Sequence, residues 1–293
     1  MQSPPLAIVR VFAPETWGEV AYFAKFYAAT YELKAEAKRA VSGVNSHFDK
    51  AMLLLNVARK IAPNLAIDRA QLNATGATPA HNSREFSAVI EEVFTELYSS
   101  IDCACQVIVA TRKHCRGMPS GSTRKLFSKV TKGEVSNEFP ERIKQSMISA
   151  EWYWDLLFLR DELTHLSVGS CSLSSDGDAI TYMHQGILKA GRPLIIEDIF
   201  AHAANLCERI NQFLGEVFNH LNSELKPSEI DVPCAFAHGR IYMRKLSSER
   251  PVTLQSGKCN SRHWFDANDA YRCPLVDECE AYNHPVSPVI TTT

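Results

Sequence analysis

The chain has 293 residues, of which 45% are hydrophobic and 22% are charged, a balance ordinary for a soluble protein with a packed core. The formal net charge of −2 excludes a strongly basic protein, so nucleic-acid binding would need a local basic patch. No uninterrupted apolar run has membrane-spanning length, and the N-terminus lacks the layout of a signal peptide, so we expect a cytoplasmic protein. The nine cysteines are an odd number, which favours reduced thiols over a disulfide framework.

The first half of the chain is helical in pattern. Residues 6–12 are a possible strand or an extended lead-in, and residues 15–61 carry apolar side chains at steps of three and four. Gly43 and Asn45 are expected to divide that segment into two helices. A long helix is predicted from Asn82, because Glu85 follows it at the spacing of a capping box, and its apolar positions form one stripe.

Residues 115–132 form a basic connector rich in small residues. Its charges fit either a solvated loop or a rim that contacts phosphates, and the sequence leaves both readings open. After Pro140 a third helix follows, in one or two pieces, and it ends in the stretch 152–169. Its amphipathic pattern stops where Ser167, Val168 and Gly169 follow.

Residues 171–173 and 179–184 are strand candidates around a hairpin-turn signal at 175–178. A fourth long helix is predicted over 196–225, and Pro227 ends it. Long helices with short connections predict an all-α fold: an antiparallel helical bundle over residues 1–225 with a small β-hairpin insertion. Residues 226–293 are expected to form a Cys/His-rich C-terminal appendage.

Arg160, Asp161 and His165 stand together at the end of the third helix. If the helix continues to His165, this residue points about 140° away from Arg160, because five residues turn a helix by about 500°. The two side chains can therefore converge only if the last turn unwinds, or if a second chain brings its own copy alongside. The bland alternative is an exposed arginine and a histidine that caps the helix end.

This segment, L-R-D-E-L-T-H-L, resembles the motif of the HEPN superfamily (higher eukaryotes and prokaryotes nucleotide-binding domains). That motif is an arginine, a polar residue, three to five further residues and a histidine; here Asp161 follows Arg160 and His165 closes the pattern. Asp161 departs from the more typical asparagine. The resemblance covers residues 15–225, and it implies a helical bundle that acts as a dimer.

The resemblance also implies a function: a metal-independent endoribonuclease of defence or toxin–antitoxin type, with RNA as substrate, a homodimeric assembly and an antitoxin protein as a possible partner. His165 would transfer protons, Arg160 would stabilise the phosphorane and Asp161 would orient one of them. The alternative is a non-catalytic HEPN-like module that binds nucleotide, RNA or a protein partner. No cofactor is expected for catalysis.

The C-terminal appendage contains Cys259, His263, Cys273 and Cys279, with His284 close behind. Four such ligands within about twenty residues suit tetrahedral zinc, which would hold together a segment poor in aliphatic residues. The spacings C-x3-H and C-x5-C are uncommon for zinc sites. A set of reduced, partly buried thiols therefore remains the alternative to a structural zinc ion.

Cys234 and His238 form a second, weaker pair at i, i+4 spacing. A zinc-dependent hydrolase that uses this appendage is a third functional class. The chain has no H-E-x-x-H motif, and the candidate ligands resemble a closed structural set, so the sequence argues against this class.

Overall fold

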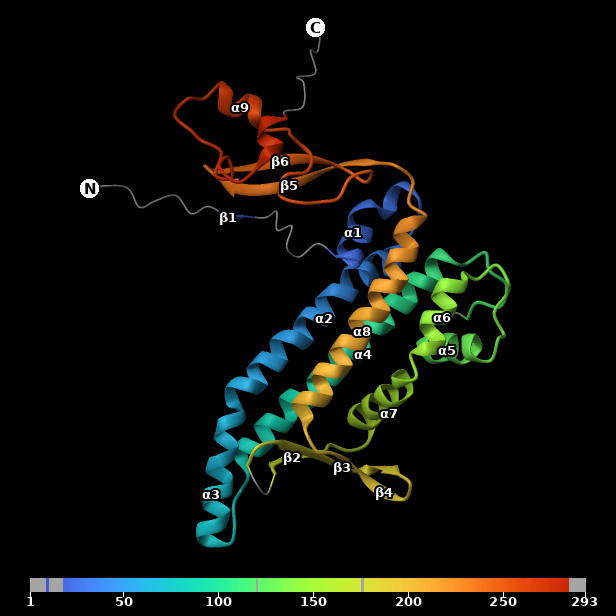
Figure 1. Ribbon diagram of the computed structural model, residues 1–293, viewed down its shortest axis with the longest axis vertical. Coiled ribbons are helices and arrows are strands. Elements are labelled where there is room, and N and C mark those ends of the chain that lie inside the picture. The colour runs from blue at the N-terminus through green and yellow to red at the C-terminus, as the bar shows by residue number, and fades with distance from the viewer. Residues whose placement is uncertain (1–8, 11–17, 120, 175–176, 285–293) are drawn as a thin grey trace, which may run out of the picture. The chain divides into compact units, whose positions relative to one another are not determined.

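The computed structural model describes residues 9–10, 18–119, 121–174 and 177–284. The chain divides into two compact units (Figure 1). We call Leu33–His220 the bundle unit, and Met1–Glu32 together with Leu221–Thr293 the terminal unit. The domain predicted over residues 1–225 therefore spans parts of both units.

The bundle unit is built on long helices that pack lengthwise. Its helices are α2 (Ala35–Ile61), η3 (Ala62–Asn64), α3 (Leu65–Thr75), α4 (His81–Thr111), α5 (Thr123–Thr131), α6 (Glu141–Ser149), α7 (Trp152–His165) and most of α8 (Ile199–Ser223). Helices α2 and α4 lie side by side (Figure 1). Helix α8 packs on α4 through aromatic contacts, including an edge-to-face pair of Phe86 and Phe200 whose ring centroids are 5.7 Å apart.

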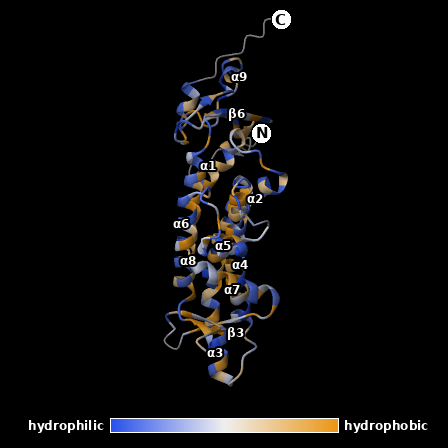
Figure 2. Cartoon of the chain, turned by 90° about the vertical axis from the view of Figure 1, so that its right-hand side faces the viewer, coloured by the Kyte–Doolittle hydropathy of each residue, from blue (hydrophilic) through white to orange (hydrophobic). Residues whose placement is uncertain are grey.

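Helix α4 is the central helix of the bundle unit. The predicted stripe is confirmed, because Phe86, Ile90, Val93, Leu97 and Ile101 are all fully buried. By length and hydropathy α4 is also apolar enough to cross a membrane, and 61% of its most apolar window is buried inside the protein. Along the helices of this unit hydrophobic and hydrophilic residues alternate (Figure 2), as expected for amphipathic helices.

Two local predictions for these helices are wrong. Helix α2 is continuous through Gly43, where an added Cβ would lie 2.6 Å from Sγ of Cys103 on α4. This glycine therefore allows close approach of two helices and does not end one. The capping box at Asn82 does not form either: α4 begins at His81, and the Asn82 amide donates to Asp68 Oδ1 over 2.7 Å.

A three-stranded antiparallel sheet follows α7 in the chain, in the order β2-β3-β4: β2 (Ser170–Leu173), β3 (Ile180–Lys189) and β4 (Arg192–Ile196). The first two strands confirm the predicted hairpin, although residues 175–176 of its turn lie outside the described residues. The third strand was not predicted. Its turn is built on Ala190 and Gly191, which both have positive φ, as tight hairpin turns require.

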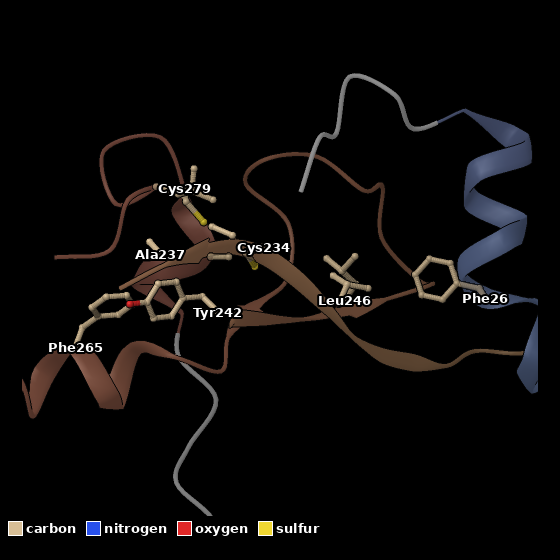
Figure 3. Packing of buried hydrophobic residues seen from close by; sticks show 11 residues of the cluster. Phe26, Cys234, Ala237, Tyr242, Leu246, Phe265 and Cys279 are labelled. Atoms are coloured by element: carbon tan, nitrogen blue, oxygen red, sulfur yellow. The ribbon is translucent and has the colours of Figure 1, made fainter. Parts of the chain in front are cut away.

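The terminal unit holds a second antiparallel sheet, in the order β1-β5-β6-β7. Its elements are β1 (Val9–Arg10), α1 (Glu19–Phe26), η2 (Tyr27–Ala29), β5 (Glu229–Ala237), β6 (Arg240–Ser247), β7 (Lys258–Cys259), α9 (Arg262–Asp266) and η4 (Glu280–Asn283). Its core (Figure 3) contains Val232, Leu246 and Leu275 among alanines, cysteines and aromatic rings. Four partly buried aliphatic residues pack against this core: Leu225, Ile230, Val252 and Leu254.

The expectation of an all-α fold is wrong. The protein is predominantly helical but mixed, because both units contain an antiparallel sheet. The hairpin β5–β6 escaped prediction because Pro233 and a β-bulge between Pro233 and Ala235 interrupt its alternation. The bulge places two buried residues, Cys234 and Ala235, next to each other, so period two is lost where a strand would be recognised.

Candidate active site on helix α7

Helix α7 carries the predicted site residues, and it stays helical through His165. The helix ends there, with the backbone N–H of Leu166 donating to the carbonyl of Glu162 over 2.9 Å. The last turn does not unwind, so Arg160 and His165 point about 140° apart on one chain. A site that uses both side chains on one phosphate therefore needs a second copy of the helix.

Arg160 is held in place on the surface of the bundle unit. Its Nη1 donates to Asp161 Oδ1 over 2.9 Å, and its Cζ lies 5.1 Å from the centroid of the Tyr98 ring. The side chains of Arg160 and Asp161 remain 32% and 40% exposed. An ion pair this exposed contributes about 0–1 kcal/mol, so a phosphate group can compete with Asp161 for the guanidinium.

A stack of aromatic rings lies under the side chain of Arg160, on the side of the helix core. Tyr98 on α4 stacks on Tyr153, and Tyr153 lies parallel to Phe127 of α5 at a centroid distance of 3.7 Å. Tyr153 and Phe127 are fully buried. Burial raises the pKa of Tyr98 and of Tyr153, so both phenols stay protonated near neutral pH. The stack is a rigid platform that positions Arg160, and its phenols are not proton-transfer groups.

His165 lies exposed at the end of α7, beside apolar side chains that are also exposed. Phe158 on the same helix is 66% exposed, Leu166 is 78% exposed, and Leu188 on β3 is 64% exposed. Phe158 and Leu188 line a groove of about 550 Å³ between α7, the sheet and α8, and His165 does not. Exposed apolar surface of this kind is typical of a protein–protein contact.

The segment after His165 is tied to a buried polar network that the sequence analysis missed. Glu91 on α4 accepts two hydrogen bonds at Oε1, from the Gly169 backbone over 2.6 Å and from the Tyr182 hydroxyl over 3.0 Å. Nε2 of the fully buried His184 lies 3.1 Å from the carbonyl oxygen of Ser167. Only the glutamate in the middle of an apolar stripe signals this network in the sequence.

Burial raises the pKa of Glu91, although hydrogen bonds from Gly169 and Tyr182 and the charge of His184 oppose this shift. The carboxyl also lines a cavity of about 780 Å³ between α3, α4 and β2. The walls of the cavity are mostly apolar, with Arg69 and Arg84 among the lining residues. The sequence analysis did not predict this cavity.

The basic connector forms α5 and the turns before it. Four of its cationic side chains are exposed: Arg116, Arg124, Lys125 and Lys132. The ammonium group of Lys129 donates to the Gly117 carbonyl over 2.7 Å. The α5 ring of Phe127 belongs to the platform under Arg160. Arg124 and Lys125 are therefore exposed on the helix whose Phe127 stacks on Tyr153, and their exposure fits a solvated surface as well as a rim that contacts phosphates.

The predicted zinc ligands all lie in the terminal unit. Cys259 and Cys279 are buried, Cys273 is partly buried, and His263 is exposed on α9. Within the part of the chain that the structure describes, no group of three His, Cys, Asp or Glu side chains has the arrangement of metal ligands. Zinc binding by these four residues stays a prediction.

Comparisons with known protein families, with curated proteins and with solved structures found no match. The case for a function therefore depends on the residues of this chain and on the arrangement of α7.

Proposed function

We propose that this protein is a dimeric, metal-independent endoribonuclease whose active site combines Arg160 of one chain with His165 of a second. We also propose that the protein is HEPN-like. Its role would then lie in defence or as the toxin of a toxin–antitoxin pair. The observation that carries it is the fixed, half-exposed guanidinium of Arg160, on the helix that ends at the exposed His165.

In the proposed reaction the 2′-hydroxyl of a ribose attacks the neighbouring phosphorus. The new O2′–P bond forms as the P–O5′ bond breaks, which leaves a 2′,3′-cyclic phosphate and a free 5′-hydroxyl. One proton leaves the attacking hydroxyl and one reaches the departing oxygen. An imidazole side chain can serve as the acid or the base in either transfer, and we assign this role to His165. The planar guanidinium of Arg160 binds two phosphorane oxygens at once.

Two features support assembly as a dimer. The first is that Arg160 and His165 point in different directions on an intact helix. A two-fold axis through the ends of two α7 helices would bring Arg160 of one chain close to His165 of the other. The second is the exposure of the apolar side chains Phe158, Leu166 and Leu188 on α7, at its end and on β3, because a second copy of the same surface would bury them.

The test is incubation of the purified protein with total RNA in the presence of EDTA. We expect cleavage to persist and to leave 2′,3′-cyclic phosphate or 3′-phosphate ends. His165→Ala should reduce the rate by at least about 10²-fold, since a general acid or base contributes that much. Arg160→Lys should also fail, because an ammonium lacks the planar fork. Asp161→Asn should change the cleavage rate little or increase it. If His165→Ala cleaves RNA as fast as the wild type, the site assignment is wrong.

The second candidate is a non-catalytic module that binds a nucleotide, RNA or a protein partner. Two observations favour it: the ion pair that occupies Arg160, and the cavity beside Glu91. If the wild-type protein binds RNA but cleaves none under any condition tested, this alternative replaces the nuclease.

A further inference from the structure

The cavity of about 780 Å³ in the bundle unit has no part in the proposed nuclease reaction. It lies where α3, the first turns of α4 and the strand β2 meet (Figure 1). Its volume is in the range of sites that bind small organic molecules. Two apolar side chains that line it, Leu72 and Val168, are 46% and 71% exposed. A ligand in the cavity would cover such side chains.

Hydrogen bonds hold the three elements around the cavity together. Asp68 of α3 accepts at Oδ1 from the Asn82 amide and at Oδ2 from the backbone N–H of Ser83, both over 2.7 Å. On the other side of α4, the hydroxyl of Ser87 accepts from the backbone N–H of Cys171 in β2 over 2.8 Å. The walls are therefore fixed before any ligand arrives, so that binding does not have to order them.

One face of α4 forms a wall of the cavity whose two ends differ in charge. Arg84, Ala88 and Glu91 all line the cavity, and a helix brings residues at i, i+4 and i+7 onto one face. Arg84 is exposed, whereas Glu91 is buried. Arg84 and Glu91 are two helical turns apart, which is about 10 Å along the axis. The wall therefore has a cation at one end, a small side chain in the middle and a carboxyl group at the other end.

The cationic groups of the cavity suit an acidic ligand. Among the described residues no carboxylate pairs with Arg84. Arg69 of α3 lines the same cavity, and its Nη1 donates to the carbonyl of Ser174 over 2.7 Å. Asp68 lines the cavity as well, but both of its oxygens already accept hydrogen bonds from α4. A carboxylate, sulfonate or phosphate group would therefore find guanidinium groups to pair with.

The carboxyl end of the α4 wall offers a hydrogen-bond acceptor. Oε1 of Glu91 accepts from the Gly169 backbone and from the Tyr182 hydroxyl. Within the part of the chain that the structure describes, no group donates to the other oxygen, Oε2. A buried acceptor without a donor destabilises the folded state. A ligand with an N–H or O–H group would satisfy Oε2 when it binds.

We infer that this cavity binds a small amphipathic acid with a hydrogen-bond donor about 10 Å from its acidic group. The acidic group pairs with Arg84 and Arg69, and the donor bonds to Oε2 of Glu91. The body of the ligand between these two ends is apolar, because it lies against side chains such as Leu72 and Val168. The inference goes beyond the proposed nuclease and does not depend on it.

The first experiment titrates the full-length protein with anilinonaphthalene sulfonate, a fluorescent anion that binds apolar surface. We expect saturable binding by the wild type. Arg84→Gln should weaken binding about fivefold, the effect of one partly exposed ion pair. Ala88→Trp should abolish binding, because it fills the cavity from an exposed position. Arg124→Gln on α5 and Ala70→Trp on α3 are matched controls that should bind like the wild type, since both positions are exposed and neither lines the cavity.

The second experiment tests the donor by displacing the bound dye with octanoate or with its ω-amino derivative. Both are acids with the same apolar chain, but only the amino derivative carries N–H donors at the far end. It should displace the dye from the wild type at a severalfold lower concentration than octanoate does, and this advantage should vanish in Glu91→Gln. If the two acids displace the dye equally well from the wild type, the donor is wrong. If Arg84→Gln and Ala88→Trp bind the dye as tightly as the wild type, or the wild type does not bind it, the cavity is not the site.

Discussion

Gly169 offers a sharp test of the packing that fixes the chain after His165. A Cβ atom added at this position would lie 2.4 Å from both Cζ and the hydroxyl oxygen of Tyr182. The ring cannot yield easily, because Tyr182 is fully buried and its hydroxyl bonds to Glu91. Gly169→Ala should therefore force either the ring or the segment after α7 to move.

The cost can be estimated from what must be displaced. Overpacking a buried site costs about 1–3 kcal/mol. Loss of the Tyr182–Glu91 or Gly169–Glu91 hydrogen bond inside the core costs about 1–3 kcal/mol more. Alanine has a smaller backbone entropy than glycine in the unfolded chain, and this stabilises the folded state by about 0.4–1 kcal/mol. We expect the free energy of unfolding to fall by about 2–5 kcal/mol.

Two other glycines are matched controls in the same urea titration, followed by circular dichroism. Gly186→Ala creates an even shorter contact, 2.2 Å to Glu162 Oε1, but that atom ends a flexible, partly exposed side chain, so the loss should stay within about 1 kcal/mol. Gly215 lies inside α8 with open space around it, so alanine should stabilise by about 0.5–1 kcal/mol. If Gly169→Ala is as stable as the wild type, the account of this segment is wrong.

Two more predictions concern Glu91 and Phe158. Burial raises the Glu91 pKa above 4.5, so the folded state holds this proton more tightly than the unfolded state. As the pH rises from the ordinary glutamate pKa through the raised value, the wild type should therefore lose stability relative to Glu91→Gln. Urea titrations in which the free energies of unfolding of the two proteins change in parallel with pH would contradict this. Phe158→Asp should leave the fold intact, since this side chain is 66% exposed, and should weaken dimers in light scattering. If the wild-type protein is strictly monomeric at micromolar concentration, the proposed dimer is wrong.

Much of the bundle unit follows from periodicity. The stripe on α4 was predicted from the spacing of apolar residues. The division of the third helix into α6 and α7 was one of the two alternatives that the sequence left open. Gly43 was misread because the sequence does not show that Cys103 of another helix approaches it. Local patterns identify helices well, but they do not reveal which glycine serves a turn and which serves a close contact.

The candidate site could be predicted only in part. Arg160 and His165 were identified by their spacing, whereas the Tyr98 platform and the Glu91 network arise from residues far apart in the sequence. The β5–β6 hairpin was hidden for a local reason, because a bulge at Cys234 breaks the strand pattern.

The most direct test of the central claim is a mixing experiment with two inactive variants. Arg160→Ala and His165→Ala are purified separately, mixed in equal amounts and allowed to exchange subunits before RNA is added in EDTA. A site shared across the two-fold axis leaves one intact site in each mixed dimer, so the mixture should recover about one quarter of wild-type activity. A mixture as inactive as its two components contradicts a site built from Arg160 of one chain and His165 of the other.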